Sequence, residues 1–342
     1  MKDISVNGIN FHNLEKTWIV AEIGVNHEGD FDTAAKLIKL AAKCGVNAVK
    51  FQTFRIEHYI SKVQSERYER TKKYQLSYEQ FRELAVIASE SGVILFSTPF
   101  HFDDVDFLDE FVPLFKVSSG DLTYLSLIRY IASKNKPMII STGLGTKKEI
   151  QAVLNTILDL RPDAGIKGEL ILLHCVTAYP TPVDKANLKR IVWLRETFDL
   201  PVGYSDHTLG IKACELAVAS GAKVLEKHFT YRKENQAFHD HAISADSEDM
   251  SQLVKMVRQA EAYMGCKKTL HGNSDEKMRS HMRRSIGAAV NVPAGKPVQI
   301  EWLTYLRPSW GLSPDQIDKV VGKRLIRGVQ AGDLIRLEDI ED

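Results

Sequence analysis

Charged side chains occur inside strongly apolar segments of this sequence, where charges are uncommon. Glu22, Lys50 and Lys116 lie in three such segments. A buried ammonium group needs an anion, because an unpaired charge away from water is costly. That anion is either a protein carboxylate, with Glu22, Asp121 and Glu226 as candidates, or a phosphate or carboxylate of a ligand. A lysine that forms a Schiff base with a carbonyl substrate is a third interpretation.

Hydroxyl and imidazole groups follow further apolar segments. The hydroxyl groups that suit an anion are those of Thr98, Ser141 and Ser205. His207 and His228 end two successive segments, and two neutral imidazoles can share a divalent ion with Glu22 or Asp240. Such an ion keeps open positions for a substrate oxygen. The alternative is a pair of hydrogen-bonded structural histidines.

The other histidines are less informative. His27 and His174 fit either a site or its support, while His239 and His241 flank Asp240 and offer a third ligand. We expect ordinary surface or loop positions for His12, His58, His101, His271 and His281.

Eight apolar segments, each followed by a more polar stretch, occupy the first three quarters of the chain. They span residues 18–25, 48–54, 94–100, 115–120, 138–143, 170–176, 202–206 and 224–229. Near-continuous apolar segments are typical of parallel strands buried on both faces. Between them, apolar residues recur every three or four positions and predict helices, over residues 31–43, 78–91, 147–160 and 212–220. Eight strand–helix units predict an α/β fold, a (β/α)8 TIM barrel. A doubly wound open sheet is the alternative, although no GxGxxG motif follows the first segment.

In a (β/α)8 barrel the active site lies at the carboxyl ends of the strands. Lys50 and Gln52 point to the same side of their strand, because side chains alternate with a period of two. All eight segments carry polar residues near or just beyond their carboxyl ends, which a purely structural barrel does not need. We therefore expect these side chains to meet at one rim.

The chain changes character after the barrel pattern. Residues 1–265 form the predicted barrel domain, and residues 266–282 are polar and charged, as expected of a linker. Residues 283–342 predict a small β-rich domain. Within it, segments 292–301 and 329–338 share an Ala-Gly pair with a Glu seven residues after the Ala. Two copies indicate a duplication but are too few for a solenoid.

Composition excludes several classes of protein. The 342 residues include 45 Lys and Arg and 44 Asp and Glu, so a net charge of +1 excludes a globally basic nucleic-acid binder. We find no run of about 18 apolar residues and no apolar leader, and expect neither a membrane span nor a signal peptide. Four distant cysteines without a CxxC pair indicate reduced thiols and a cytoplasmic protein.

At these residues the chain resembles the sialic acid synthase family, which includes N-acetylneuraminate, legionaminate and pseudaminate synthases. The motifs occur in family order: EIGVNHEG at 22–29, VKFQT at 49–53, FSTPF at 96–100, Lys116 with SGD at 119–121, STG at 141–143, YPTP at 179–182, SDH at 205–207 and EKHF at 226–229. The final part resembles the antifreeze-like (SAF) domain of these synthases, including RPSWGLSP at 307–314. The resemblance covers nearly the whole chain.

The resemblance implies a reaction. Phosphoenolpyruvate condenses with the open aldehyde form of an N-acetylated hexosamine, such as N-acetylmannosamine. Water attacks C2 of phosphoenolpyruvate, phosphate leaves by C–O cleavage, and a nine-carbon 2-keto-3-deoxy acid results. Family members use a divalent metal ion, commonly Mn²⁺, with Mg²⁺ as the alternative.

It also implies roles for individual residues. The catalytic candidates are Glu22, Lys50 and Lys116, with Glu22 as the proton-transfer group or the partner of a metal-bound water. His207 and His228 hold the metal. Phosphate and carboxylate groups bind to Lys50, Lys116, Thr98, Ser141 and Ser205, and the sugar binds to Gln52, Tyr179, Asp240 and Arg307. In the family the SAF domain of one subunit caps the barrel of its partner, so the resemblance implies a domain-swapped homodimer in which Arg307 reaches the N-acetyl group.

The sequence departs from the family pattern on the sugar side. Residues 237–241 read AFHDH where many members have Gly-Pro-Asp-His, and Thr177 replaces an Asn of many bacterial members. Residues 308–311 are closer to the pseudaminate type, whereas EIG and FQT near the start look like the neuraminate and legionaminate types. A 2,4-diacetamido-trideoxy sugar is therefore the alternative acceptor.

Two other classes of function fit less well. A metal-dependent hydrolase on the same barrel needs more ligands than His207 and His228, and no early HxH pair is present. A non-enzymatic ice-binding protein favours flat arrays of Thr and Ala, but the final domain is rich in Arg, Glu and Lys.

Overall fold

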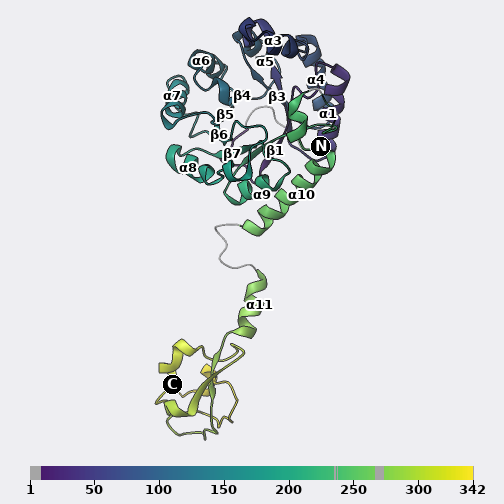
Figure 1. The fold of residues 1–342 in the computed structure, drawn as a ribbon. Coiled ribbons are helices and arrows are strands. Elements are labelled where there is room, and N and C mark those ends of the chain that lie inside the picture. Colours follow the sequence, from purple (N-terminus) through teal and green to yellow (C-terminus); the bar gives the residue numbers. More distant parts are fainter. Residues whose placement is uncertain (1–8, 235, 237, 266–272, 342) are drawn as a thin grey trace. The chain divides into compact units, whose positions relative to one another are not determined.

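The computed structural model describes residues 9–234, 236, 238–265 and 273–341, and it divides into two compact units after Gly265 (Figure 1). This division coincides with the end of the predicted barrel. The first part of the expected linker, residues 266–272, lies outside the described residues, as do His271 and Ala237. The rest of the expected linker forms helix α11 (Asn273–Met282).

Eight parallel strands close into a barrel, as the sequence predicts. They are β1 (Trp18–Gly24), β2 (Ala48–Thr53), β3 (Ile94–Pro99), β4 (Phe115–Val117), β5 (Met138–Ser141), β6 (Leu170–His174), β7 (Val202–Asp206) and β8 (Val224–His228). β1 pairs with β8, with Trp18 opposite Val224, so the ring is complete and the open-sheet alternative is wrong. Most strands end one to three residues earlier than expected, because the chain turns into the rim loops there.

Helices cover the outside of the barrel (Figure 1). They are α1 (Phe31–Lys43), α2 (Ile56–Tyr59), α3 (Ser65–Lys72), α4 (Tyr78–Glu90), α5 (Phe102–Asp109), α6 (Leu125–Ser133), α7 (Lys147–Leu158), α8 (Lys189–Phe198), α9 (Lys212–Ala219) and α10 (Ser247–Met264). The predicted helix over residues 31–43 is confirmed, and its apolar positions Leu37 and Ile38 are buried. Asp30 caps this helix by accepting a hydrogen bond from the N–H of Thr33.

The barrel interior is apolar below its carboxyl end. Trp18 and Phe96 stack with ring centroids 5.9 Å apart, and both are buried. Side chains alternate along a strand, so Trp18 shares one face of β1 with Glu22. The charged residues nearer the rim therefore lie above an apolar floor.

The second unit is small and rich in β structure. β9 (Ser285–Ala288) and β10 (Leu303–Leu306) form an antiparallel pair. Val292 and Val329, the first residues of the two repeated segments, exchange two backbone hydrogen bonds of 2.9 and 3.0 Å. The duplicated segments therefore lie side by side.

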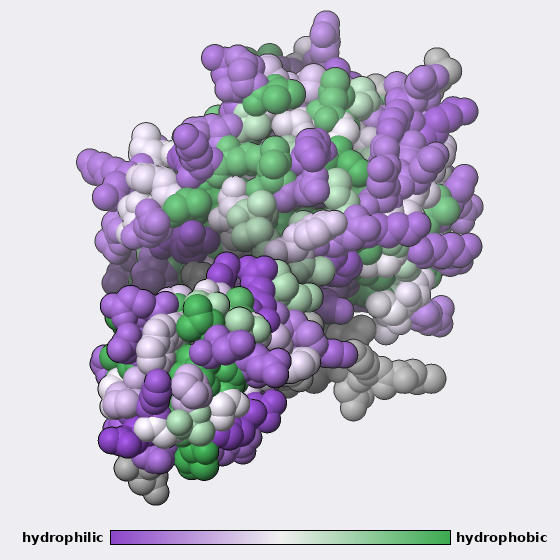
Figure 2. Space-filling model, turned by 90° about the horizontal axis from the view of Figure 1, so that it is seen from below, coloured by the Kyte–Doolittle hydropathy of each residue, from purple (hydrophilic) through white to green (hydrophobic). Residues whose placement is uncertain are grey.

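The surface is of mixed polarity. Hydrophilic side chains cover most of the face in Figure 2, with apolar ones between them. Among the helices of the described residues, none combines the length and apolar character that a membrane span requires. Three described cysteines, Cys44, Cys175 and Cys214, are free and buried.

Gly203 in β7 allows a close approach of neighbouring strands. A Cβ there would lie 2.4 Å from the carbonyl oxygen of Val224 and 2.5 Å from Cδ2 of Leu173. We expect Gly203→Ala to lower the free energy of unfolding by about 1–3 kcal/mol in urea titrations, because the strands must move apart. The control is Gly165→Ala, whose Cβ would meet only Cδ2 of Leu200, at 3.4 Å. Equal losses in the two variants would contradict the packing argument.

Candidate active site

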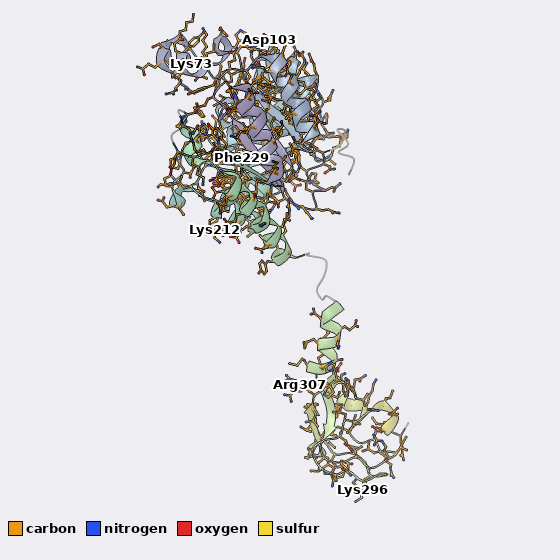
Figure 3. All side chains as sticks on the ribbon, turned by 90° about the vertical axis from the view of Figure 1, so that its right-hand side faces the viewer. Lys73, Asp103, Lys212, Phe229, Lys296 and Arg307 are labelled. Atoms are coloured by element: carbon orange, nitrogen blue, oxygen red, sulfur yellow. The ribbon has the colours of Figure 1, made fainter. Side chains whose placement is uncertain are left out.

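A cavity of about 270 Å³ lies at the carboxyl ends of the barrel strands. Eleven of the twelve residues predicted for the site line it: Glu22, Lys50, Gln52, Thr98, Lys116, Ser141, Tyr179, Ser205, His207, His228 and Asp240. The twelfth, Arg307, is an exposed residue of the second unit that directly follows β10 (Figure 3). The barrel thus brings together residues that lie more than two hundred positions apart.

Lys50 has protein carboxylates as partners. Its Nζ lies 2.9 Å from Oε1 of Glu22 and 3.7 Å from Oε2 of Glu226, and all three side chains are buried. Burial disfavours the charged ammonium, but the two carboxylates outweigh it and raise the pKa of Lys50. Burial raises the pKa of Glu22 to about 7, against the opposing effect of Lys50. Glu22 therefore exchanges a proton readily near neutral pH.

Lys116 has a different environment. Its Nζ donates to Oγ of Ser141 at 2.7 Å and to the carbonyl oxygen of Val117 at 3.1 Å. Among the described residues, no carboxylate oxygen lies within 4.0 Å of this nitrogen, so the internal pairing considered for it is not formed. Burial lowers the pKa of Lys116, because the charged form lacks a close counter-ion. An anionic ligand would supply that counter-ion.

Glu226 belongs to the same group of charges. Ser205 donates a hydrogen bond of 2.8 Å to its Oε1, so this hydroxyl holds a carboxylate in place. Burial alone would raise the pKa of Glu226, but Lys116 and Lys50 outweigh it and lower the pKa. Glu226 was considered only as a lysine partner, although it lies two residues before His228 in β8 and so faces the same side.

His207 and His228 both line the cavity, with ring centroids 5.4 Å apart. Nδ1 of His207 lies 2.7 Å from the carbonyl oxygen of Val176, so it carries the proton and leaves Nε2 with a free lone pair. Nδ1 of His228 is buried, has no hydrogen-bond partner among the described residues, and lies 3.6 Å from Oδ2 of Asp240. Burial lowers the pKa of both imidazoles, which keeps them neutral. This donor set fits a divalent ion.

The described residues 238–241 reach the cavity through Asp240. Asp240 lies in the short helix η4 (His239–Ile243), and burial raises its pKa to about 6. His241 turns away to Thr230, 2.6 Å from its Nδ1, and the N–H of Phe238 donates to Oε1 of Glu28 at 2.8 Å. Of the histidines left undecided, His27 and His174 do not line the cavity.

Several lining residues were missed by sequence reasoning. The β2–β3 connection contributes Tyr59 and Arg67, and Phe100 follows β3. Cys175 also lines the cavity, and its Sγ lies 3.0 Å from Oγ of Ser119. Phe100 and Cys175 lie at strand ends, where position alone could have identified them. Arg67 lies in an inserted helix and has no comparable signal.

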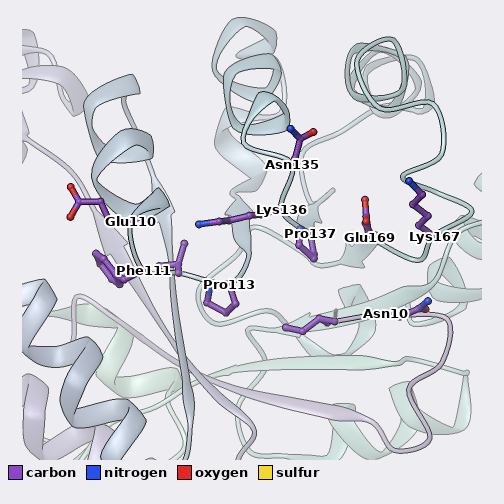
Figure 4. A pocket seen from close by; sticks show the side chains of 11 residues that line it. Asn10, Glu110, Phe111, Pro113, Asn135, Lys136, Pro137, Lys167 and Glu169 are labelled. Atoms are coloured by element: carbon purple, nitrogen blue, oxygen red, sulfur yellow. The ribbon is translucent and has the colours of Figure 1, made fainter. Parts of the chain in front are cut away.

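A larger cavity, of about 560 Å³, lies at the opposite end of the barrel (Figure 4). Its residues Pro137 and Glu169 directly precede β5 and β6, and Pro113 lies two residues before β4. The charges there are paired, with Lys136 at 2.8 Å from Oδ1 of Asp109 and Glu169 bound to Arg161. The volume of a cavity therefore does not identify the active site. We assign the active site to the smaller cavity, which the predicted site residues line.

Comparison with known proteins identifies the families to which the two parts of the chain are similar. Residues 37–269 match the NeuB family, and residues 283–341 match the SAF domain. An N,N'-diacetyllegionaminic acid synthase of Legionella pneumophila is 37% identical over 98% of each chain. A pseudaminic acid synthase of Campylobacter jejuni is 33% identical over 96% of this chain and 98% of its own. The solved structure of N-acetylneuraminic acid (sialic acid) synthetase from Leptospira borgpetersenii has a TM-score of 0.72 and 31% identity, over 77% of this chain and 90% of that chain.

Gly143 lies close against side chains of the cavity wall. A Cβ there would lie 2.7 Å from Sγ of Cys175 and 2.8 Å from Oγ1 of Thr177, both in the cavity wall. We expect Gly143→Ala to weaken the binding of inorganic phosphate by about tenfold in calorimetry, because these side chains must move into the cavity. Gly165→Ala is the control, since Gly165 does not line this cavity and its Cβ would meet only Cδ2 of Leu200, at 3.4 Å. Equal affinities in the two variants would contradict this prediction.

Proposed function

Because this chain belongs to the NeuB family of sialic-acid-type synthases, we propose that it condenses phosphoenolpyruvate with the aldehyde form of an N-acetylated hexosamine. N-acetylmannosamine or a related sugar is the acceptor, and the products are a nine-carbon 2-keto-3-deoxy acid and phosphate. The observation that carries this proposal is a buried lysine without a close carboxylate in the same cavity as two neutral histidines. The family and the barrel with a SAF domain, both expected from the motifs, are confirmed.

Phosphoenolpyruvate needs several cations and hydrogen-bond donors. Lys116 supplies a buried positive charge, and Ser141 lies 2.7 Å from it. Thr98 lies 3.5 Å from Nζ of Lys50. Ser205 was expected to bind an anion, but its proton is donated to Glu226, so we assign it to holding that carboxylate. Arg67 adds a further cation to the cavity wall.

The reaction forms a bond between C3 of phosphoenolpyruvate and the aldehyde carbon, whose oxygen gains a proton. Water adds to C2 and loses one proton, and the resulting C2 hydroxyl loses the second to the departing phosphate as the C–O bond breaks and the ketone forms. Glu22 is suited to hold or transfer one of these protons, because its pKa of about 7 matches neutral conditions. Lys50, 2.9 Å away, stabilises the carboxylate form.

His207 and His228 are the residues that would hold a divalent ion, Mn²⁺ or Mg²⁺, with Asp240 close to His228. Such an ion would polarise the sugar aldehyde or orient the attacking water. The protein fixes the ring of His207 through Val176 and places Tyr179 over it, with ring centroids 4.2 Å apart. These contacts orient the histidine before any ion binds.

The acceptor site is formed by Gln52, Tyr179 and Asp240, all in the cavity wall. Arg307 joins it in a domain-swapped homodimer, in which the SAF domain of one subunit reaches the barrel of its partner. The alternative acceptor is a 2,4-diacetamido-trideoxy sugar, since the 37% identical relative is an N,N'-diacetyllegionaminic acid synthase. A cytoplasmic location stays a prediction.

The proposed reaction is tested by phosphate release from phosphoenolpyruvate in the presence of Mn²⁺. The acceptors are N-acetylmannosamine, mannose, and the 2,4-diacetamido sugars of the legionaminate and pseudaminate types. We expect release with one N-acetylated acceptor and none without a sugar, because C–C bond formation precedes loss of phosphate. Release at the same rate with or without any sugar would contradict the synthase assignment.

His207→Ala should remove the metal dependence together with activity, because one imidazole cannot hold the ion alone. Bound manganese is measured by elemental analysis after dialysis, alongside turnover with phosphoenolpyruvate and the active sugar. His281→Ala, an exposed histidine of the second unit, is the control and should keep both. Turnover that still depends on manganese in His207→Ala would exclude this residue as a ligand.

Arg307→Ala should lower kcat/KM for the sugar by roughly 1.5–3 kcal/mol, through loss of a charge-assisted hydrogen bond to the N-acetyl group. The affinity for phosphoenolpyruvate should hardly change. Arg336→Ala, another exposed arginine of the second unit, is the matched control. A collapse of phosphoenolpyruvate affinity in Arg307→Ala would show that its assigned role is wrong.

A further inference from the structure

Three metal-ligating side chains meet at the barrel rim, outside the active-site cavity. His58 lies in α2, and His101 and Asp103 lie at the start of α5. One nitrogen of each imidazole and one oxygen of Asp103 lie within 4.8 Å of one another. Nδ1 of His101 is 3.4 Å from Oδ2 of Asp103. This equals the spacing of about 3.4 Å between ligands on a tetrahedral ion with bonds of about 2.1 Å.

Each of the two histidines is adjacent in the sequence to an aromatic residue of the cavity wall. Their rings are 3.9 Å apart between centroids, and neither residue lines the cavity. The next residue after His58 is Tyr59, and the residue before His101 is Phe100. These two rings line the cavity and lie 4.2 Å apart. The β2–α4 connection thus makes two ring contacts with the segment between β3 and α5. Tyr59 contacts Phe100, and His58 contacts His101.

The state of these side chains suits a metal ion. The N–H of Asp103 donates a long hydrogen bond of 3.4 Å to Nδ1 of His101, and an ion bound at this nitrogen would replace it. His58 and Asp103 are exposed, which gives an ion access from solvent. Two imidazoles with one carboxylate, and room for water, match the ligands that Zn²⁺ prefers, whereas Mg²⁺ and Ca²⁺ prefer all-oxygen sites.

We propose that His58, His101 and Asp103 form a second divalent-cation site, of the zinc type, separate from His207 and His228. An ion there joins the β2–α4 connection to the start of α5. It thereby orders the wall made by Tyr59 and Phe100, together with the neighbouring helix α3, which carries Arg67. The inference does not depend on the proposed reaction, because its tests use no substrate.

Cobalt binding to the full-length chain tests the site, with Co²⁺ as a coloured substitute for Zn²⁺. His207→Ala removes a ligand of the cavity site and should keep a visible Co²⁺ absorption that added Zn²⁺ abolishes. Adding His101→Ala to this variant should remove that absorption and one equivalent of bound cobalt. Adding His281→Ala instead should change neither. His58→Gln, on an exposed residue, repeats the test in case His101→Ala disturbs folding.

Limited trypsin digestion tests the ordering of the rim. The segment carries Lys62, Arg67, Arg70 and Lys72, all exposed cleavage sites. We expect Zn²⁺ to slow cleavage there by about tenfold in His207→Ala, since binding stabilises only the ordered form. The slowing should be absent when His58→Gln is added. Unchanged cobalt binding in the His58 and His101 variants would overturn the proposed site. Cobalt binding without slower trypsin cleavage would overturn its role in ordering the rim.

Discussion

The charge balance among four buried side chains is the constraint on which the active site depends. Glu22, Lys50, Lys116 and Glu226 come from β1, β2, β4 and β8, and each is nearly inaccessible to water. Lys50 lies between the two carboxylates, and the pKa of Glu22 is raised to about 7, so part of the negative charge is neutralised by protonation. The hydrogen-bond partners of Lys116 are one hydroxyl and one carbonyl group, and Glu226 acts on its charge without a direct ion pair. An anionic substrate would complete the balance, which is the reason for proposing phosphoenolpyruvate rather than a neutral ligand.

The barrel strands hold these charged side chains at the carboxyl end, above the apolar residues that fill the barrel interior. Each strand presents alternate residues to the interior, so a shift of one residue in register would turn Lys50 or Glu226 away from the cavity. Trp18 and Phe96 fill the interior below, and the low polarity there strengthens every interaction above it. The two histidines share this environment. Burial keeps them neutral, so the same lack of water that raises the pKa of Glu22 prepares them as ligands.

Much of this could be predicted from the sequence, because the signals were local. Apolar segments with polar ends identified the strands, and the alternation of side chains paired Lys50 with Gln52. The strand expected over residues 115–120 stops at Val117, because Ser119–Asp121 form a short 3-10 helix that turns the chain into the rim. Tyr59 and Arg67 lie in helices inserted between β2 and β3, whose path depends on tertiary packing. His58 and His101 were expected to be ordinary surface residues, since 43 positions separate them and only the folded loops bring their rings together.

Anomalous X-ray diffraction from crystals grown with Mn²⁺ and phosphoenolpyruvate tests the central claim most directly. The account predicts a manganese peak bonded to His207 and His228, with the anionic groups of phosphoenolpyruvate against Lys116 and Ser141. Manganese absent from these histidines, or phosphoenolpyruvate bound away from Lys116, would contradict it.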